Sequence, residues 1–265
     1  MPNMLEVKNL RVQFKSRPDK WAVDGVSFSI GEGEILGLVG ESGSGKSVTA
    51  MAVSGLLQKS LIEYEGNILV DGKEMLDTER TDIHEMQGTD IAVVFQEPMT
   101  SLDPVMKVGQ QVEEALSIHH PEMSPEEKKE KALLAMAQAG LFDVENVYTK
   151  YPHELSGGML QRVCIAAAII SNPKLLIADE PTTALDVTTQ KHIIELLKKI
   201  NKESGTSILF ISHNLAVVRA LCDKVIVMQK GKLVEGGSIE EIYTNPKHPY
   251  TQKLLAAIPS RDKRY

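Results

Sequence analysis

The sequence predicts an α/β protein with a mainly parallel sheet, an antiparallel β region near its N-terminus and a helical insertion in its middle. Short apolar runs typical of buried strands recur along the chain, and helical patterns separate most of them. Residues 100–152 interrupt this alternation, because they hold amphipathic helical patterns and no strand pattern. Alternating strands and helices imply a parallel sheet that is covered on both faces.

The first expected elements are strands. Residues 4–14 and 26–30 alternate between apolar and polar side chains, and the Gly-Glu-Gly-Glu sequence at 31–34 predicts a tight turn. Residues 35–39, Ile-Leu-Gly-Leu-Val, form a continuous apolar run typical of a strand buried on both faces. A helix is expected from about Lys46 to Leu57, and further strands at 66–70 and 91–95.

The helical insertion contains two clear helix signals. Residues 108–117 form one candidate helix, and Ser124-Pro125-Glu126-Glu127 begins another. Serine caps a helix, proline suits its first turn, and acidic side chains are favourable near its positive end. After the insertion, strands are expected at 175–178, 207–211 and 225–228, and helices near 158–170, 188–204 and 215–220.

The composition is ordinary for a soluble globular protein, with 42% hydrophobic and 25% charged residues in a chain of 265. A net charge of −7 disfavours sequence-independent binding to nucleic acid, which we exclude as a partner. No apolar run approaches the roughly 18 residues of a membrane-spanning helix, and the N-terminus lacks a signal-peptide pattern. We therefore expect a cytoplasmic chain that reaches a membrane only through a partner.

A glycine-rich loop directly follows the apolar run at 35–39, with the sequence Gly40-Glu41-Ser42-Gly43-Ser44-Gly45-Lys46-Ser47. The backbone N–H groups of such a loop and the N-terminus of the next helix form a cradle for phosphate. Gly40, Gly43 and Gly45 allow the backbone conformation and the close approach that the cradle requires. Lys46 can reach the β- and γ-phosphates, and the Ser47 hydroxyl can bind Mg²⁺. The order of strand, loop and helix predicts an ATP site rather than a chance glycine-rich turn.

Two acids end the apolar sequence Leu175-Leu176-Ile177-Ala178. Asp179 is placed to hold Mg²⁺, and Glu180 to orient and deprotonate the attacking water. A pair of acids after a strand can also be a solvated strand end. The upstream loop favours the catalytic interpretation, because ATP hydrolysis needs the phosphate cradle, the metal and the base together.

A third element, Leu155-Ser156-Gly157-Gly158-Met159-Leu160-Gln161-Arg162, begins an apolar helix. Ser-Gly-Gly at a helix start is a further anion site, although alone it is a weak signal, since serine caps many helices. Its position between the phosphate loop and the acid pair gives the chain a resemblance to the ATP-binding-cassette (ABC) ATPase family. The resemblance extends from about Leu5 to Pro259 and implies a P-loop ATPase core in an ABC nucleotide-binding domain.

The resemblance implies roles for further residues. Gln96 is similar to the glutamine that senses Mg²⁺ and water, and His213 to the switch histidine that contacts the γ-phosphate. Residues 184–186, Ala-Leu-Asp, resemble the loop that crosses to a partner subunit. Phe14 resembles the aromatic side chain that stacks on adenine. A core phenylalanine in a strand would look the same, and Trp21 is a competing candidate; the distance from the phosphate loop favours Phe14.

The resemblance also implies that one chain is an incomplete enzyme. In this family the Ser156-Gly157-Gly158 element closes over the nucleotide bound to the opposing subunit. Two ATP molecules therefore lie between two head-to-tail subunits. A second helix N-terminus adds positive potential where the γ-phosphate is most negative.

Three segments resemble the ATPases of peptide/nickel importers. They are Phe-Gln-Glu-Pro-Met-Thr-Ser-Leu-Asp-Pro at 95–104, Tyr-Pro-His-Glu-Leu at 151–155 and Asn-Pro-Lys-His-Pro-Tyr-Thr-Gln-Lys-Leu-Leu at 245–255. Met159 stands where most cassettes carry glutamine, as in the first of the two unlike ATPases that these importers use. This resemblance implies a heterodimer with a second related ATPase, or else a homodimer. It further implies two membrane permease subunits, an extracytoplasmic solute-binding protein and a peripheral place at the cytoplasmic face of the cell membrane.

The expected function is ATP hydrolysis that drives the uptake of peptides or of nickel and metallophore complexes. Longer peptide-importing relatives continue with a cysteine-bearing extension, and its absence after Tyr265 favours the nickel or metallophore type, although short oligopeptide members exist. A non-transport ABC ATPase or a regulatory ATP-binding module is the alternative. The expected organisation is one domain over 1–265, with a core of 1–99 and 156–245, a helical subdomain at 100–155 and a C-terminal tail at 246–265.

Overall fold

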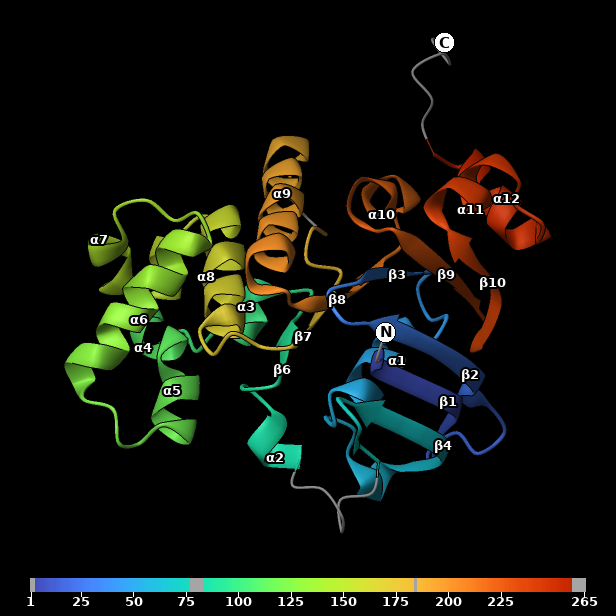
Figure 1. Ribbon diagram of the computed structural model, residues 1–265, viewed down its shortest axis with the longest axis horizontal. Coiled ribbons are helices and arrows are strands. Elements are labelled where there is room, and N and C mark those ends of the chain that lie inside the picture. The colour runs from blue at the N-terminus through green and yellow to red at the C-terminus, as the bar shows by residue number, and fades with distance from the viewer. Residues whose placement is uncertain (1–2, 77–82, 184, 259–265) are drawn as a thin grey trace. The chain divides into compact units, whose positions relative to one another are not determined.

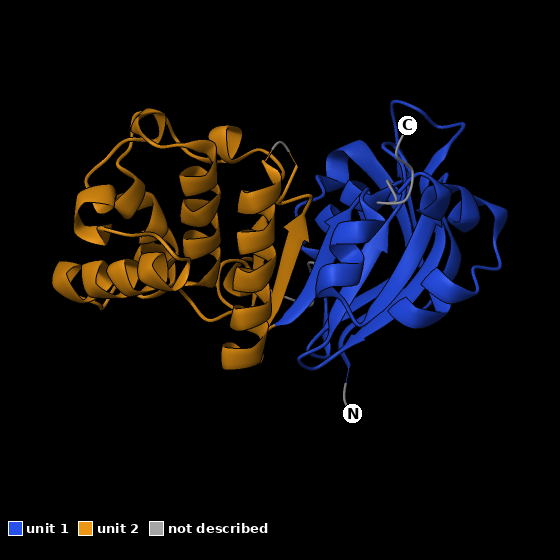
Figure 2. Cartoon of the chain, turned by 90° about the horizontal axis from the view of Figure 1, so that it is seen from above, with its two compact units in different colours: residues 1–81, 207–265 blue, residues 82–206 orange. Residues whose placement is uncertain are grey.

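The computed structural model (Figure 1) describes residues 3–76, 83–183 and 185–258. The chain forms two compact units, coloured separately in Figure 2. The first unit combines Met1–Thr81 with Ser207–Tyr265, and the second is Asp82–Thr206. Segments from both ends of the sequence therefore build one folded unit, and the middle of the sequence builds the other.

The first unit contains two groups of strands, with short helices from both ends of the chain. Its elements are β1 (Asn3–Phe14), β2 (Trp21–Gly31), β3 (Ile35–Val39), α1 (Lys46–Val53), η1 (Lys59–Leu61), β4 (Ile62–Val70), β5 (Lys73–Glu74), β8 (Ser207–Ser212), α10 (Leu215–Leu221), β9 (Lys224–Gln229), β10 (Lys232–Ser238), α11 (Ile239–Thr244) and α12 (Pro249–Ala256).

The N-terminal strands pair in the order β2-β1-β4-β5, and each neighbouring pair is antiparallel. The other strands of this unit lie in the order β10-β9-β3-β8, with β3 parallel to both β8 and β9 and β10 antiparallel to β9. Every residue of β3 and β8 is buried, as expected of parallel strands covered on both faces. The predicted antiparallel region and mainly parallel sheet are both confirmed.

The second unit is mostly helical and contains two parallel strands. Its elements are α2 (Ile83–Met86), β6 (Ile91–Val94), α3 (Pro98–Ser101), α4 (Val108–Val112), α5 (Glu114–His119), α6 (Pro125–Gln138), α7 (Val144–Tyr148), η2 (Pro152–Glu154), α8 (Gly157–Ile169), β7 (Leu175–Asp179) and α9 (Val187–Ser204).

Helix α8 is the centre of the second unit. Helices α3, α4 and α6 pack against it, and so does β6, which pairs in parallel with β7. Eight of its 13 residues are buried, which explains why its sequence is apolar on most sides. The predicted run of helices without strands extends in the structure from α3 to α8.

Helix α1 is shorter than the sequence predicts, because it ends at Val53 rather than near Leu57. Gly55 adopts a left-handed backbone with φ 71°. The Leu56 N–H bonds to the Met51 carbonyl, and the Gly55 N–H bonds to the Ala52 carbonyl. This pair of hydrogen bonds is the Schellman motif, which satisfies the last carbonyls of a helix and stops it.

Two C-terminal helices, α11 and α12, were not expected. Ser238 caps α11, since its Oγ accepts from the Glu241 N–H at 3.2 Å while the Glu241 carboxylate accepts from the Ser238 N–H at 2.9 Å. The Ser-x-x-Glu spacing of this capping box is a signal that the sequence contains. Helix α12 begins with Pro249 inside the segment that we expected to be a tail.

The second unit, Asp82–Thr206, contains all of the predicted helical subdomain at 100–155 together with parts of the predicted core. The division into core, helical subdomain and tail therefore stays a prediction. Within the described ranges, every helix is too short or too polar to span a bilayer.

Candidate active site

The phosphate loop (residues 40–47) lies where a buried strand gives way to a helix in the first unit. All five residues of β3 are buried up to Val39, and α1 begins at Lys46. Gly45 occupies the N-cap position with φ 108°, and no side chain caps the helix there. The first N–H groups of α1 are therefore available to an anion rather than to a side chain of the loop.

Two loop glycines are required by close packing against backbone. A Cβ atom on Gly40 would lie 2.2 Å from the Met228 carbonyl oxygen, at the end of β9. A Cβ atom on Gly45 would lie 2.5 Å from the Ala22 carbonyl oxygen, at the start of β2. Backbone carbonyls cannot swing aside as flexible side chains can, so only glycine fits at either position.

Lys46 folds back beneath this loop. Its side chain is almost fully buried, and its Nζ donates to the Gly40 carbonyl at 2.9 Å and to the Glu41 carbonyl at 3.1 Å. Ser42 and Ser47 are both exposed, so two of the three serine hydroxyls of the loop are open to solvent, while Ser44 is buried. The arrangement places one buried cation and one accessible hydroxyl in the first turn of α1.

Two distant residues also hold the loop, and no local sequence signal indicated either of them. The Gly231 N–H, in the turn between β9 and β10, donates to the Ser44 carbonyl at 2.9 Å. The Glu41 N–H donates to the hydroxyl of Tyr250, on α12, at 2.8 Å. Such contacts depend on the tertiary fold, because residues about 190 and 210 positions further along the chain supply them.

His213 directly follows β8 in the same unit and is exposed. The registered pairs Ile35–Ile208 and Val39–Ser212 show that β3 and β8 end together. The phosphate loop and His213 therefore leave the same edge of the sheet, which is the edge where ligands of parallel sheets bind.

The two candidates for stacking on adenine both belong to the antiparallel strands. Phe14 is the half-buried last residue of β1 and pairs with Ile62. Trp21 begins β2, next to Ala22, and the Arg11 guanidinium lies 5.7 Å from its ring centroid. The contact of Ala22 with Gly45 brings the start of β2 to the phosphate loop, so Trp21 stays a candidate beside Phe14.

The predicted acid pair ends β7 in the second unit. The four residues before Asp179 are buried, while Asp179 and Glu180 are half-buried. Glu180 has a positive φ of 49°, and its Oε2 accepts from the Thr183 hydroxyl at 3.0 Å. Two carboxylates therefore lie at the carboxyl end of β7, and the Thr183 hydroxyl orients that of Glu180.

Gln96 and the Ser-Gly-Gly element lie in the same unit as the acid pair. Gln96 is exposed in the short link between β6 and α3. Ser156 is the N-cap of α8, and its Oγ accepts from the Met159 N–H at 3.4 Å. Ser156 and Gly157 are exposed, and a Cβ atom on Gly157 would meet nothing within 4 Å. The N-terminus of α8 is therefore an open surface.

Asp186, from the loop expected to cross to a partner, caps α9. Its Oδ1 accepts from the N–H groups of Thr188 and Thr189, both at 3.0 Å, and its Oδ2 accepts from the Thr189 hydroxyl at 2.6 Å. The hydrogen bond from the Thr189 hydroxyl is the largest cause of a lowered pKa for this carboxyl group. Ala184, from the same loop, lies outside the described residues.

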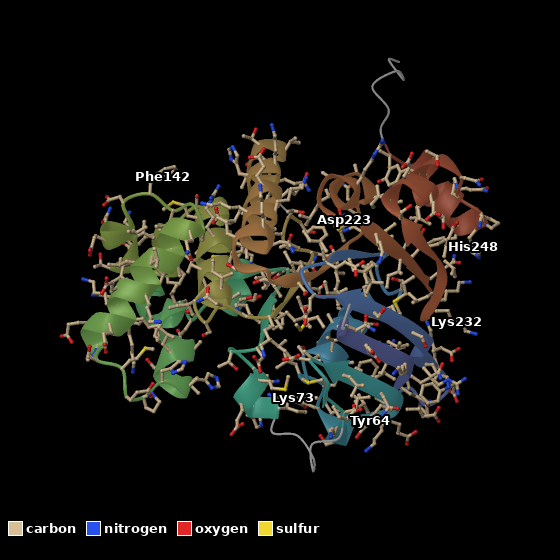
Figure 3. All side chains as sticks on the ribbon, in the orientation of Figure 1. Tyr64, Lys73, Phe142, Asp223, Lys232 and His248 are labelled. Carbon is tan, nitrogen blue, oxygen red and sulfur yellow. The ribbon has the colours of Figure 1, made fainter. Side chains whose placement is uncertain are left out.

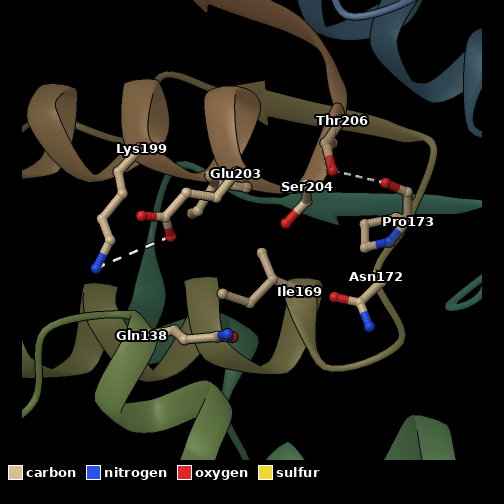
Figure 4. Close-up of a pocket in the computed structure, with 9 residues that line it drawn as sticks. Gln138, Ile169, Asn172, Pro173, Lys199, Glu203, Ser204 and Thr206 are labelled. Atoms are coloured by element: carbon tan, nitrogen blue, oxygen red, sulfur yellow. Dashed lines mark hydrogen bonds and ion pairs between the residues drawn. The ribbon is translucent and has the colours of Figure 1, made fainter.

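A cavity of about 140 Å³ in the second unit contains none of the predicted site residues. It lies where the ends of α6, α8 and α9 meet (Figure 4). Polar groups of its wall pair with each other: the Thr206 hydroxyl donates to the Pro173 carbonyl at 2.8 Å, and Lys199 pairs with Glu203 at 4.0 Å. We assign this cavity no ligand.

Two family models match the sequence. The model described as ABC transporter matches residues 23–183, and the model described as oligopeptide/dipeptide transporter, C-terminal region, matches residues 234–265. The oligopeptide transport ATP-binding protein AppD of Bacillus subtilis (strain 168) is 46% identical over 99% of this chain and 80% of its own length. The dipeptide transport ATP-binding protein DppD of Lactococcus lactis subsp. cremoris (strain MG1363) is 45% identical over 98% of this chain and 74% of its own length.

Solved structures agree with these matches. A dimeric ATP-binding cassette in a post-hydrolysis state, bound to ADP and Pi, superposes with a TM-score of 0.79 at 31% identity, over 89% of this chain and 99% of that chain. The resemblance stated from the sequence and the predicted fold class are thereby confirmed. The chain belongs to the ABC transporter family and is an ATP-binding-cassette ATPase.

Proposed function

We propose that ATP hydrolysis by this chain drives the import of short peptides through partner permease subunits. The observation that carries the proposal is a phosphate loop built between β3 and α1, in a chain whose residues 234–265 match an oligopeptide/dipeptide transporter model. The names of AppD and DppD refer to oligopeptide and dipeptide transport. We therefore propose peptides as the cargo, and nickel or metallophore complexes as the alternative.

We assign the triphosphate to the loop that contains Gly40, Ser42, Gly43, Gly45 and Lys46. Packing of Gly40 and Gly45 against backbone carbonyls of other strands supports the assignment, because it holds the loop in one conformation between β3 and α1. The uncapped start of α1 adds N–H donors and a positive helix end. We favour Phe14 for the contact with adenine, with Trp21 as its rival.

The donor atoms at the expected metal positions fit Mg²⁺, which prefers oxygen ligands. Ser47 offers a hydroxyl in the first turn of α1, Asp179 a carboxylate at the end of β7, and Gln96 a side-chain amide oxygen. We propose that these three residues hold the ion, as the family motif implies. A bound Mg²⁺ supplies neutralisation of the charge on the phosphate oxygens.

We propose Glu180 as the general base that orients the attacking water and takes its proton. The hydrogen bond from Thr183 supports this role, since it orients the Glu180 carboxylate. His213, exposed after β8, is proposed to contact the γ-phosphate. Gln96 is proposed to position the water beside the metal.

The Ser156-Gly157-Gly158 element is proposed to act on the nucleotide of an opposing subunit. Its support is the open N-terminus of α8, a helix of 13 residues with exposed Ser156 and Gly157. A helix N-terminus attracts anions, and here no side chain of the described residues lies within 4 Å of the position that a Gly157 Cβ would take. We propose a related second ATPase as the opposing subunit, or else a second copy of this chain.

The full importer is proposed to contain two permease subunits and an extracytoplasmic solute-binding protein. This places the ATPase at the cytoplasmic face of the cell membrane as a peripheral subunit. No nucleic acid is proposed as a partner.

Reconstitution in liposomes tests the cargo. The complex of this chain with its permeases and second ATPase should hydrolyse ATP faster when its binding protein carries short peptides. Nickel complexes on the same binding protein serve as the matched comparison and should give no more than the basal rate. Stimulation by nickel complexes alone would overturn peptides as the cargo, and no ATPase activity in any mixture would overturn the proposal that ATP hydrolysis by this chain drives import.

A further inference from the structure

The C-terminal helix α12 contacts the phosphate loop through one buried side chain. Tyr250 is 5% exposed, and its hydroxyl accepts the Glu41 N–H at 2.8 Å. Burial raises the pKa of Tyr250, so the phenol stays neutral at physiological pH. This backbone N–H lies in a part-buried contact and needs an acceptor, and the tyrosine supplies one across a sequence separation of 209 residues.

The peptide unit between Gly40 and Glu41 is hydrogen-bonded at both ends. Its carbonyl, on Gly40, accepts from Lys46 Nζ at 2.9 Å, while its N–H, on Glu41, donates to Tyr250. Rotation of this peptide would break both bonds at once. Hydrogen bonds in such a chain also polarise one another. The tyrosine hydroxyl therefore fixes the orientation of a carbonyl that directs the Lys46 ammonium group.

Helix α12 is itself anchored to the strand β10. The Glu235 carboxylate accepts from the N–H of Lys247 at 2.7 Å and from the N–H of His248 at 3.1 Å. His248, labelled in Figure 3, caps the helix, because its Nδ1 accepts from the Tyr250 N–H at 3.2 Å. Thr251 is completely buried beneath the same turn. These contacts hold Tyr250 in place as part of the fold.

A nearby ion pair does not account for the contact. Lys253 Nζ lies 3.6 Å from the Glu41 carboxylate, but both side chains are largely exposed. Exposed pairs of this kind contribute little, because water and salt screen them. The neutral, part-buried hydrogen bond from the Glu41 N–H to Tyr250 is the stronger link between α12 and the loop.

We propose that Tyr250 is a positioning residue for Lys46, acting through the Gly40–Glu41 peptide, and that α12 thereby sets the affinity for nucleotide. This rests on the proposed role of Lys46 in holding the triphosphate. It connects the segment that matches the oligopeptide/dipeptide C-terminal model to the chemistry of the phosphate loop.

Calorimetric titration of the full chain with a non-hydrolysable ATP analogue and Mg²⁺ tests the proposal. Tyr250→Phe keeps the ring and its packing and removes only the hydroxyl. Loss of the hydrogen bond from the Glu41 N–H should weaken binding of the analogue by about three- to tenfold, with unchanged stoichiometry. A merely structural role would instead lower the fraction of binding-competent protein and leave the dissociation constant unchanged.

Tyr243→Phe is the matched control. The Tyr243 hydroxyl donates to the Leu215 carbonyl, in the same unit but on α10. This variant should bind nucleotide as the wild type does. Equal affinities for wild type, Tyr250→Phe and Tyr243→Phe would overturn the inference while leaving the ATP site intact. Failure of the wild type to bind the analogue, by contrast, would overturn the assignment of the loop itself.

Discussion

At the scale of single residues, Glu180 combines an unusual backbone conformation with an oriented side chain. Most described non-glycine residues with positive φ are asparagine or aspartate, which tolerate the left-handed region; Glu180 and Lys230 are the two exceptions. This backbone conformation costs free energy for a glutamate. Such strain persists only where the surrounding structure holds the residue in place, and it is concentrated at functional sites. The Thr183 hydroxyl on its carboxylate shows that the side chain is oriented as well as the backbone.

Glu180→Gln should abolish turnover and leave nucleotide binding intact. The amide has nearly the same shape, but it cannot take a proton from water, so steady-state phosphate release should fall at least about a hundredfold. Binding of ATP with Mg²⁺ should stay within about twofold, as measured by filter binding or calorimetry. Thr183→Ala is the companion variant, in which the base stays but its orienting bond is lost, and the loss of rate should be smaller. Normal hydrolysis by Glu180→Gln would rule out Glu180 as the base.

At the scale of elements, the sequence predicts best where local chemistry decides the structure. The five apolar residues of β3, the glycines after them and the start of α1 at Lys46 all follow from local patterns, and the structure has them. Likewise, Ser124 caps α6 as expected, and the structure shows that it forms a capping box with Glu127. These signals concern residues a few positions apart, which is the range over which pattern reasoning works.

Contacts between distant segments escaped prediction for a physical reason. Tyr250 and Gly231 reach the phosphate loop because the C-terminal strands and helices pack beside β3, and no short-range pattern encodes that. The end of α1 is a different case. Gly55 is a local stop signal, and the helix predicted from about Lys46 to Leu57 extended past it. The roles of Gln96, His213 and Phe14 likewise come from resemblance, and they stay predictions.

The start of α8 offers a test that separates folding from function. A side chain at Gly157 enters open space, whereas a Cβ atom at Gly158 would lie 2.9 Å from Thr189 Cγ2 on α9. Gly157→Val should therefore change the free energy of unfolding by less than about 1 kcal/mol, while Gly158→Val should lower it by about 1–3 kcal/mol. Denaturant titration measures both values.

The same two variants should nevertheless both lose ATPase activity, by about tenfold or more, if the α8 N-terminus faces the nucleotide of an opposing subunit. The informative variant is Gly157→Val, in which a stable protein should be inactive. Full activity in that variant would remove the helix start from the proposed composite site.

At the scale of the whole molecule, the chain has a phosphate loop in one unit and an exposed Ser-Gly-Gly helix start in the other. An anion site left open at the surface suits a ligand that arrives with another subunit. ATP would then act as the ligand that stabilises the assembled state, and its hydrolysis would release it. The solved cassette of similar fold is itself dimeric, in a post-hydrolysis state bound to ADP and Pi.

Trapping the ATP-bound state should make this assembly measurable. Glu180→Gln protein, mixed with ATP and Mg²⁺, should sediment as a dimer, because binding persists and the hydrolysis that separates the subunits is removed. ADP should leave it monomeric. Adding Gly157→Val to the Glu180→Gln chain should prevent dimerisation without unfolding the protein, since the side chain at 157 projects into open space.

Analytical ultracentrifugation identifies the partner when it is run with this chain alone and with the related second ATPase. A dimer in the first sample indicates a homodimer, and a dimer only in the second sample indicates a heterodimer. Monomers in both samples at saturating ATP would contradict the composite site, because a nucleotide shared between two subunits must hold them together.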